Sequence, residues 1–322
     1  MENLDVHSHI LPNNAIKDLS GEIADLNGGL YDIRVFGKSI APMTKGFFDL
    51  PARSRELADL GIEGQVLSPT HHLFFYDDLE KSLKACRIQN ESISRVVKES
   101  NGRYIGNATL PMQSPKDALT ELDYAYSKLE LNGIEIGTNI NGLNLDDESL
   151  FPIYEKAQEL KMPIFVHPND FMGGKRLQKY YMGIVVGTLA ETTVAVTSMV
   201  FGGVFRVFPQ LNMIFCHGGG AIPYQIGRLM HAARTRKEIQ GMETDIHALM
   251  KTIHFDTVVF REDALLTLLR ERGVNNVVFG TDYPFNMGQW DSAKMIKNAS
   301  GIEPGARRKI LAENAKRLYG LK

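Results

Sequence analysis

The sequence is poor in cysteine and has no excess of charge of either sign. Cys86 and Cys216 are its two cysteines in 322 residues, too few for a disulfide framework, which is typical of a protein from a reducing compartment. The formal net charge of −2 gives no reason to expect a nucleic-acid partner. Two short basic clusters, Arg234–Lys237 and Arg307–Lys309, are interpreted as solvated faces of helices.

The sequence also lacks an obvious targeting or membrane-spanning segment. Met1–His7 has neither the basic start nor the apolar core of a signal peptide. The most apolar stretch, Tyr180–Phe205, contains Glu191, and a charge inside a membrane span is costly. We therefore expect a buried or subunit-contacting helical segment there, no membrane association, and a cytoplasmic protein.

Several common enzyme motifs are missing. There is no Gly-x-Ser-x-Gly, no Walker A loop and no Gly-x-Gly-x-x-Gly, which argues against a serine esterase, a P-loop enzyme and a dinucleotide enzyme. The composition, 43% hydrophobic and 23% charged, is that of a globular protein long enough to bury a large core.

Strand-like and helix-like segments alternate along almost the whole chain. Eight continuously apolar segments predict buried strands: Leu4–His7, Gly64–Leu67, Tyr104–Thr109, Gly133–Gly137, Pro163–His167, Asn212–His217, Thr252–Asp256 and Asn276–Thr281. Segments of helical periodicity follow: Leu50–Leu60, Leu79–Glu99, Pro115–Leu131, Asp147–Leu160, Ile222–Ile239, Glu262–Arg272, Ser292–Asn298 and Pro304–Tyr319.

Eight strand–helix units in this length predict a (β/α)₈ TIM-like barrel formed by a single domain, residues 1–322. A doubly wound open sheet is the alternative. Two segments exceed the minimal unit. Ile10–Phe48 predicts an extended loop after the first strand, which forms a small excursion or a lid over the barrel mouth. Phe171–Phe208 predicts a helical insertion after the fifth strand.

Polar side chains stand at the carboxyl ends of several predicted strands. His7 and His9 are two residues apart, so they share one face of the first strand. His167 ends the fifth strand and Asp282 ends the eighth. Each has a structural explanation when taken alone, such as a helix cap for the aspartate. Jointly they predict a metal site, because these strand ends meet at one rim of a barrel and zinc prefers imidazole and carboxylate donors.

A further histidine, His217, ends the apolar run Asn212–Cys216 and precedes three glycines and an amphipathic segment. An imidazole beside a metal-bound water suits proton transfer near neutral pH, so His217 is the predicted acid–base residue. The Gly218–Gly220 turn either presents backbone N–H groups to an anionic oxygen or is simply a tight turn. Cys216 neighbours His217 in the strand, so we expect it to face the outer helices as a core residue.

The remaining histidines are assigned less specific positions. His71 and His72 follow the second predicted strand, where one of them could line the pocket, although an exposed-loop position is the preferred interpretation. His231, His247 and His254 are interpreted as structural or superficial.

The phrases around these residues resemble the amidohydrolase-superfamily decarboxylases, most closely the branch that acts on carboxymuconate semialdehydes. The matching phrases are spread in order over nearly the whole chain: Met1–Pro12, Ala108–Gln113, Leu150–Tyr154, Phe165–Pro168, Ala190–Thr193, Gly202–Phe205, His217–Ala221 and Gly280–Phe285. The resemblance implies a barrel enzyme with Zn²⁺ or another divalent metal such as Mn²⁺, no organic cofactor, and non-oxidative loss of CO₂. The implied enzyme is a carboxy-lyase acting on an unsaturated or aromatic carboxylic acid.

The resemblance also implies roles for individual residues. It gives His7, His9, His167 and Asp282 as metal ligands and His217 as the catalytic acid–base, and leaves open whether His217 or Asp282 delivers the proton to carbon. Arg228 matches an arginine that reaches across a dimer interface to a substrate carboxylate, which implies a homodimer and a small anionic substrate.

The substrate pocket matches less well than the metal site. A second substrate-binding cation of the family cannot be aligned with a single one of Arg34, Lys38 and Lys45. Asn169 stands where the family has an aromatic residue, and together with Arg228 it is a candidate substrate contact. The alternative function is a metal-dependent hydrolase or hydratase of the same superfamily with the same ligands, and a ligand-binding barrel without activity ranks third.

Overall fold

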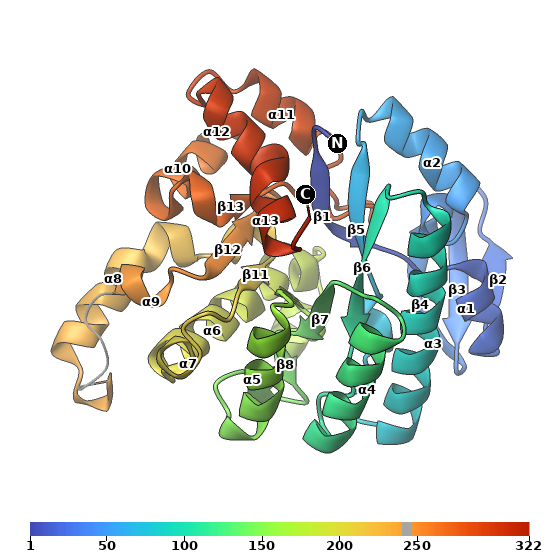
Figure 1. The fold of residues 1–322 in the computed structure, drawn as a ribbon, viewed down its shortest axis with the longest axis horizontal. Helices are drawn as coiled ribbons and strands as arrows, with labels where there is room; N and C mark the ends of the chain where they lie inside the picture. Colours follow the sequence, from blue (N-terminus) through green and yellow to red (C-terminus); the bar gives the residue numbers. More distant parts are fainter. Residues whose placement is uncertain (240–245, 322) are drawn as a thin grey trace.

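Eight parallel strands form the centre of the computed structural model, which describes residues 1–239 and 246–321 (Figure 1). In spatial order they are β1 (Leu4–His9), β5 (Gly64–Ser68), β6 (Tyr104–Thr109), β7 (Gly133–Gly137), β10 (Ile164–His167), β11 (Met213–Phe215), β12 (Ile253–Asp256) and β13 (Val277–Val278). The edge strands meet as well, because the backbone N–H of Val6 donates to the Phe279 carbonyl at 2.9 Å and that of Asp282 to the His7 carbonyl at 2.8 Å. The sheet is therefore a barrel, as predicted, and the alternative of an open doubly wound sheet was wrong.

Helices cover the outside of the barrel (Figure 1). They are α2 (Leu50–Asp59), α3 (Leu79–Glu99), α4 (Pro115–Ser127), α5 (Phe151–Leu160), α8 (Ile222–Thr235), α10 (Glu262–Arg272), α11 (Ser292–Asn298), α12 (Pro304–Arg308) and α13 (Asn314–Leu318). Side-chain caps fix two of the starts: Asp49 accepts from the backbone N–H of Ala52 in α2, and Asp78 accepts from that of Lys81 in α3. The predicted C-terminal helix is divided by a π-helical segment, η9 (Lys309–Glu313).

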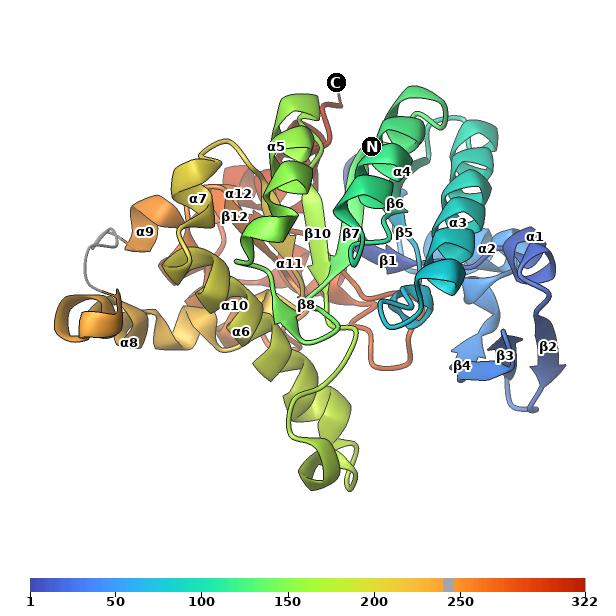
Figure 2. The same ribbon diagram turned by 90° about the horizontal axis from the view of Figure 1, so that it is seen from below.

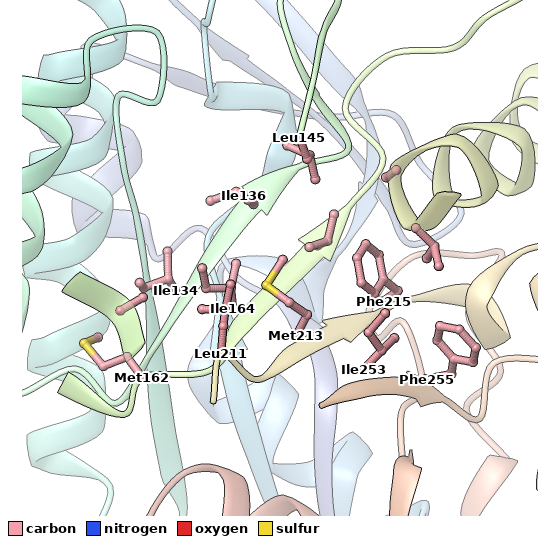
Figure 3. Packing of buried hydrophobic residues seen from close by; sticks show 14 of the residues in the cluster. Ile134, Ile136, Leu145, Met162, Ile164, Leu211, Met213, Phe215, Ile253 and Phe255 are labelled. Atoms are coloured by element: carbon pink, nitrogen blue, oxygen red, sulfur yellow. The ribbon is translucent and has the colours of Figure 1, made fainter. Parts of the chain in front are cut away.

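The core consists of two apolar layers. Strand residues that face outward pack under the helices, as Ile134, Ile164 and Met213 do on neighbouring strands (Figure 3). A second cluster includes Phe165 and Ile214. This double-sided burial explains why the strands are continuously apolar in sequence rather than alternating.

The first predicted insertion is more ordered than its weak periodicity suggested. It contains α1 (Asn13–Asp18) and an antiparallel sheet of β2 (Glu22–Asp25), β3 (Leu30–Val35) and β4 (Lys38–Thr44), followed by the short turn η1 (Lys45–Phe47). Its separate small core explains its stability, and includes Leu11, Ile16, Ile33, Val35, Ile40 and Phe47. Thr44 Oγ1 donates to the Pro284 carbonyl at 3.2 Å, which ties this sheet to the loop after β13.

The second insertion is helical, as predicted, and includes η4 (Gly174–Leu177), the π-helical η5 (Gly183–Gly187), α6 (Thr188–Phe201) and α7 (Val204–Val207). It projects from the same side of the barrel as the β2–β4 sheet (Figure 2). Among the described residues, one helical stretch, Gly183–Phe201, has the length and apolar composition needed to cross a membrane. However, 44% of its apolar window is buried within the protein. Glu191 inside it is buried and accepts hydrogen bonds from Thr138, Asn139 and the Met172 backbone.

Candidate metal centre and active site

Four loops and strand ends carry the predicted site residues to one rim. His7 and His9 lie at the end of β1, His167 ends β10, His217 begins the short turn η6 (His217–Gly219) after β11, and Asp282 follows β13. His217 and Asp282 have left-handed backbone conformations, with φ of 53° and 59°. Non-glycine residues adopt this conformation rarely and mostly where function or a tight turn requires it.

The predicted ligand atoms lie close together. His7 Nε2 is 3.1 Å and His9 Nε2 is 3.5 Å from Asp282 Oδ1. Two donors bound about 2.1 Å from one ion at tetrahedral angles are about 3.4 Å apart, so these separations fit a shared ion. The His167 ring centre is 5.2 Å from that of His7 and 4.7 Å from that of His9. The structure thus brings the four predicted ligand residues together.

Unpaired buried atoms support the fit to a cation. The Nε2 atoms of His7, His9 and His167 and the Asp282 Oδ1 atom are buried and make no hydrogen bond among the described residues. Buried polar atoms rarely stay without a partner, and a single cation bound between these four atoms would satisfy all of them. The donor set of imidazoles and one carboxylate is that of a divalent transition metal.

The ring nitrogens that face away from this point are held in place. His7 Nδ1 lies 2.5 Å from Asp256 Oδ2, His9 Nδ1 lies 3.2 Å from the Pro69 carbonyl, and His167 Nδ1 lies 2.9 Å from the Pro168 carbonyl. Such partners fix the tautomer that leaves Nε2 free to bind a metal.

Electrostatic effects among these side chains are strong. Burial alone would lower the pKa of His7, but the carboxylates of Asp282 and Asp256 outweigh it and raise this pKa to about 10. Burial would raise the pKa of Asp282, but His7, His217 and His9 hold it well below its usual value. Burial lowers the pKa values of His9 and His167. Asp282 is therefore ionised and two of the imidazoles are neutral, the forms that bind a metal.

His217 lies beside the other carboxylate oxygen of Asp282, the one that His7 and His9 do not approach. Its Nε2 lies 3.5 Å from Asp282 Oδ2, and its ring centre is 5.3 Å from that of His7 and 5.4 Å from that of His167. Ligand atoms of His7, His167, His217 and Asp282 all lie within 4.8 Å of one another. A proton carried by His217 would therefore be delivered within a few ångströms of any group held between these residues.

The neighbour of His217 does not face away from it. Cys216 is buried, as predicted, but its Sγ lies 3.1 Å from His217 Nδ1 and 3.9 Å from Thr192 Oγ1 on α6. The predicted orientation was wrong because the strand ends at Phe215, so the alternation of faces no longer applies at His217.

His71 and His72 are not in an exposed loop, so the preferred interpretation of these residues was wrong. The His71 ring stacks on the ring of His167 at 4.3 Å, and ligand atoms of His9, His71 and His167 lie within 4.8 Å of one another. The ring of His72 packs against that of His71, with ring centres 4.1 Å apart and planes tilted by 31°. Both residues lie in the short turn η2 (His71–Leu73), which follows β5.

The candidate substrate contacts differ in their placement. Asn169 packs against the end of β7, where its Oδ1 is buried and has no hydrogen-bond partner among the described residues. Arg228 is exposed on α8, and no hydrogen bond or ion pair joins it to the described parts of the same chain. The role of Arg228 in binding the substrate across a subunit interface stays a prediction.

The three alternative cations for a second anion contact are also separated by the structure. Arg34 pairs with Asp32 at 2.8 Å, and Lys45 lies 3.4 Å from Asp49. Lys38 Nζ instead lies 5.9 Å from the centre of the Phe75 ring, and its charge acts on His72. Of the three cations, Lys38 is the one that makes no ion pair among the described residues.

Sequence reasoning missed two buried carboxylates. Asp256 holds His7, and its other oxygen accepts from the backbone N–H of Gly218 at 2.8 Å. Glu135 on β7 lies 3.6 Å from His9 Nδ1, both of its oxygens lack hydrogen-bond partners among the described residues, and burial raises its pKa well above the usual value. Asp256 ends a predicted strand, so the rule that found His167 and Asp282 could have found it.

Comparisons with known proteins agree with this geometry. The family model described as "Amidohydrolase" matches residues 4–321. A "2-amino-3-carboxymuconate-6-semialdehyde decarboxylase" of Dictyostelium discoideum is 34% identical, over 99% of this chain and 91% of its own length. Among solved structures, the apo form of Metarhizium anisopliae IDCase superposes with a TM-score of 0.86 at 22% identity, covering 99% of this chain and 97% of that one.

A second solved structure carries a metal. It is a dihydroxybenzoic acid decarboxylase from Polaromonas sp. JS666 with bound manganese and the inhibitor 2-nitroresorcinol, with a TM-score of 0.79 at 23% identity, covering 99% of this chain and 96% of that one. At these identities the superpositions show that the barrel fold is shared.

Proposed function

The chain belongs to the amidohydrolase family, and on this basis we propose that it is a metal-dependent, non-oxidative decarboxylase. Its substrate is an unsaturated acid of the carboxymuconate semialdehyde type or an aromatic carboxylic acid. The observation that carries the proposal is the convergence of His7, His9, His167 and Asp282 at one rim, with His217 beside them, in a chain similar to a carboxymuconate semialdehyde decarboxylase over nearly its whole length.

The proposed ligands of the metal are His7, His9, His167 and Asp282, and Zn²⁺ is the proposed ion, with Mn²⁺ as the alternative. A bound dication supplies positive charge that polarises substrate oxygens and lowers the pKa of a water molecule. Asp256 keeps His7 oriented, because a carboxylate on the remote imidazole nitrogen fixes the ring. No organic cofactor takes part in the proposal.

The remaining side chains are proposed to move the proton. His217, or Asp282 after it has itself taken up a proton from a neighbouring group, donates a proton to the substrate carbon that bears the carboxylate. The bond from this carbon to the carboxylate then breaks, its electron pair restores the unsaturated system, and CO₂ leaves. The product carries hydrogen where the substrate carried the carboxylate, so no oxidant or reductant is needed.

The active form is proposed to be a cytoplasmic homodimer. Exposed Arg228 has no partner within the described parts of its own chain, and apolar side chains of the second insertion are exposed, among them Tyr180, Tyr181 and Val185. In the proposed dimer, Arg228 of one subunit contacts the substrate carboxylate in the other. Asn169 lines the same pocket beside the end of β7.

Metal analysis of the purified protein, combined with a CO₂-release screen, tests this function. The screen covers carboxymuconate semialdehydes and hydroxybenzoates, and water labelled with ¹⁸O is present throughout. We expect about one divalent ion per chain, CO₂ release from at least one acid and no ¹⁸O in the remaining product. Incorporation of ¹⁸O without CO₂ would instead identify a hydrolase or hydratase, and a protein without metal or turnover would contradict both functions.

A further inference from the structure

His71 is a half-buried imidazole that lies against the proposed metal ligands His9 and His167. Its ring lies nearly parallel to that of His167, with an interplanar angle of 21°, and meets the His9 ring edge-on at 5.7 Å. Its Nδ1 is buried and makes no hydrogen bond among the described residues. Stacking on His167 would be equally possible for an apolar aromatic ring, so packing does not explain why the residue carries nitrogen.

His72 presents a second imidazole next to the first. Its Nδ1 lies 3.1 Å from Thr70 Oγ1, which leaves Nε2 without a hydrogen-bond partner among the described residues. Thr70 is itself held, because its backbone N–H donates to Gln89 Oε1 at 3.1 Å. The contact of Nδ1 with Thr70 thus fixes the orientation of the His72 ring, and Nε2 on its other edge can bind a ligand.

One apolar side chain borders both imidazoles. The ring of Phe285, three residues after Asp282, is 5.5 Å from that of His71, 5.8 Å from that of His72 and 5.1 Å from that of His9. Phe285 therefore spans the space between the metal-ligand side of the site and the His71–His72 pair. A flat substrate that extends from the proposed metal ligands along the Phe285 ring would therefore contact these two imidazoles.

The local charge favours an oxygen with negative character. Lys38, on β4, is the cation whose charge acts on His72, and Asp282 is the carboxylate that does so. Asp282 belongs to the proposed metal ligands, so its charge is matched by the ion. An imidazole N–H group donates to an accepting oxygen, and the ammonium of Lys38 adds long-range attraction.

We propose that His71 and His72 form a second substrate subsite, which binds an oxygen-bearing group other than the carboxylate that is lost. This inference rests on the proposed function and narrows it to acids that carry a hydroxyl or a second carboxylate on the side remote from the reacting carbon. His72 contributes the better-oriented donor, because Thr70 fixes its ring. His71 lies between His167 and His72 and contacts both rings. Both act as specificity-determining residues rather than in the proton transfer.

The test is a binding measurement that does not depend on turnover. Benzoate, 3-hydroxybenzoate and benzene-1,3-dicarboxylate are titrated calorimetrically into the metal-loaded protein and into the variants His71→Phe, His72→Phe and His72→Gln. The phenylalanine variants keep a flat ring for stacking, and glutamine keeps an amide N–H donor. His231→Phe, at an exposed position on α8, is the matched control.

We expect the unmodified protein to bind at least one oxygen-bearing probe about tenfold more tightly than benzoate, as one hydrogen bond to a charged group provides. His72→Phe removes this preference with unchanged metal content and unchanged benzoate affinity, His72→Gln retains part of it, and His231→Phe has no effect. Whether 3-hydroxybenzoate or the dicarboxylate is preferred tells which oxygen group the subsite takes.

Three results would overturn the proposal: no preference in the unmodified protein, equal weakening of all three probes by His72→Phe, or loss of metal on replacement of His71, which would make His71 a ligand instead. Failure of the proposed function has a different signature. In that case no acid releases CO₂ from the unmodified protein, although the probe preference and its loss in the variants are still measured.

Discussion

Asp256 Oδ2 lies 2.5 Å from Nδ1 of His7, and both side chains are fully buried. The second oxygen of the same carboxylate accepts from the backbone N–H of Gly218, immediately after His217. One side chain on β12 therefore positions both a proposed metal ligand on β1 and the turn that carries the proposed acid–base. The proposed metal ligands and the turn that carries the proposed acid–base residue are therefore linked through the side chain of Asp256.

Asp256→Asn is expected to weaken metal binding by about 10-fold to 100-fold, because an amide holds the imidazole less firmly and does not raise its basicity. The substitution keeps size and one accepting oxygen, so the fold should persist. Metal affinity is measured by competition with a chromogenic chelator, with circular dichroism as the control for folding. Unchanged affinity would show that the Asp256 contact does not support the metal site.

His217→Asn is expected to lower kcat by about 10²-fold to 10⁴-fold, the usual contribution of a positioned acid–base. Metal content should stay unchanged, because four other side chains are the proposed ligands. The measurement is CO₂ release by a protein whose metal content is determined in the same sample. A metal-loaded variant with full activity contradicts the assignment of His217, and a variant that loses the metal makes His217 a ligand.

Much of this arrangement was predictable from sequence because two simple rules dominate it. Apolar runs of strand length gave the barrel, and polar residues at the ends of those runs gave His167 and Asp282. Both rules describe backbone position within a regular strand. They fail where the chain leaves the strand, and for this reason the orientation of Cys216 and the position of His71 were predicted incorrectly.

The remaining surprises depend on contacts between distant segments. The sheet β2–β4 has its own small core, so its strands do not follow the pattern of the barrel strands. Asp256 carried the same strand-end signal as Asp282, but its role exists only because β12 brings it against β1. Glu135 likewise has no distinguishing signal in the sequence, because its proximity to His9 arises only when the strands form the barrel.

Gly137 is expected to be required for the position of Asn169. A Cβ atom at residue 137 would lie 2.2 Å from Asn169 Oδ1, so Gly137→Ala must displace this side chain. We expect Gly137→Ala to raise KM severalfold. Asn169→Ala and the double variant should show the same raised KM. Additive losses in the double variant, determined by steady-state kinetics, would show that the two residues act separately.

His254 is expected to make stability depend on pH. Burial lowers its pKa to about 4, whereas in the unfolded chain it titrates near 6.5. Between these values the unfolded chain binds more protons, so the stabilisation by neutral His254 is complete above pH 6.5 and is lost as the pH falls toward 4. Urea unfolding at pH 7 and pH 4.5 should show a smaller loss in His254→Gln than in the unmodified protein, by about 1.4 kcal/mol per pH unit at most.

The matched control for this experiment is His247→Gln, because His247 is exposed and its replacement should leave the pH dependence as it is in the unmodified protein. Other groups with shifted pKa values, such as Asp5 with a pKa of about 6, are present in all three proteins and cancel in the comparison. An identical loss of stability in His254→Gln and in the unmodified protein would mean that His254 has the same pKa in the folded and unfolded states.

Arg228 gives the sharpest test of the proposed dimer, because it has no partner within the described parts of its own chain while His217 lies in its own site. Arg228→Ala and His217→Asn should each be nearly inactive alone. When the two variants are unfolded together and refolded as a mixture, a mixed dimer has one site with neither change, since the intact arginine comes from the other subunit. Activity should therefore reappear in the mixture and be absent from each variant refolded separately. If Arg228 served its own chain, every site in the mixed dimer would carry one of the two changes, and no activity would return.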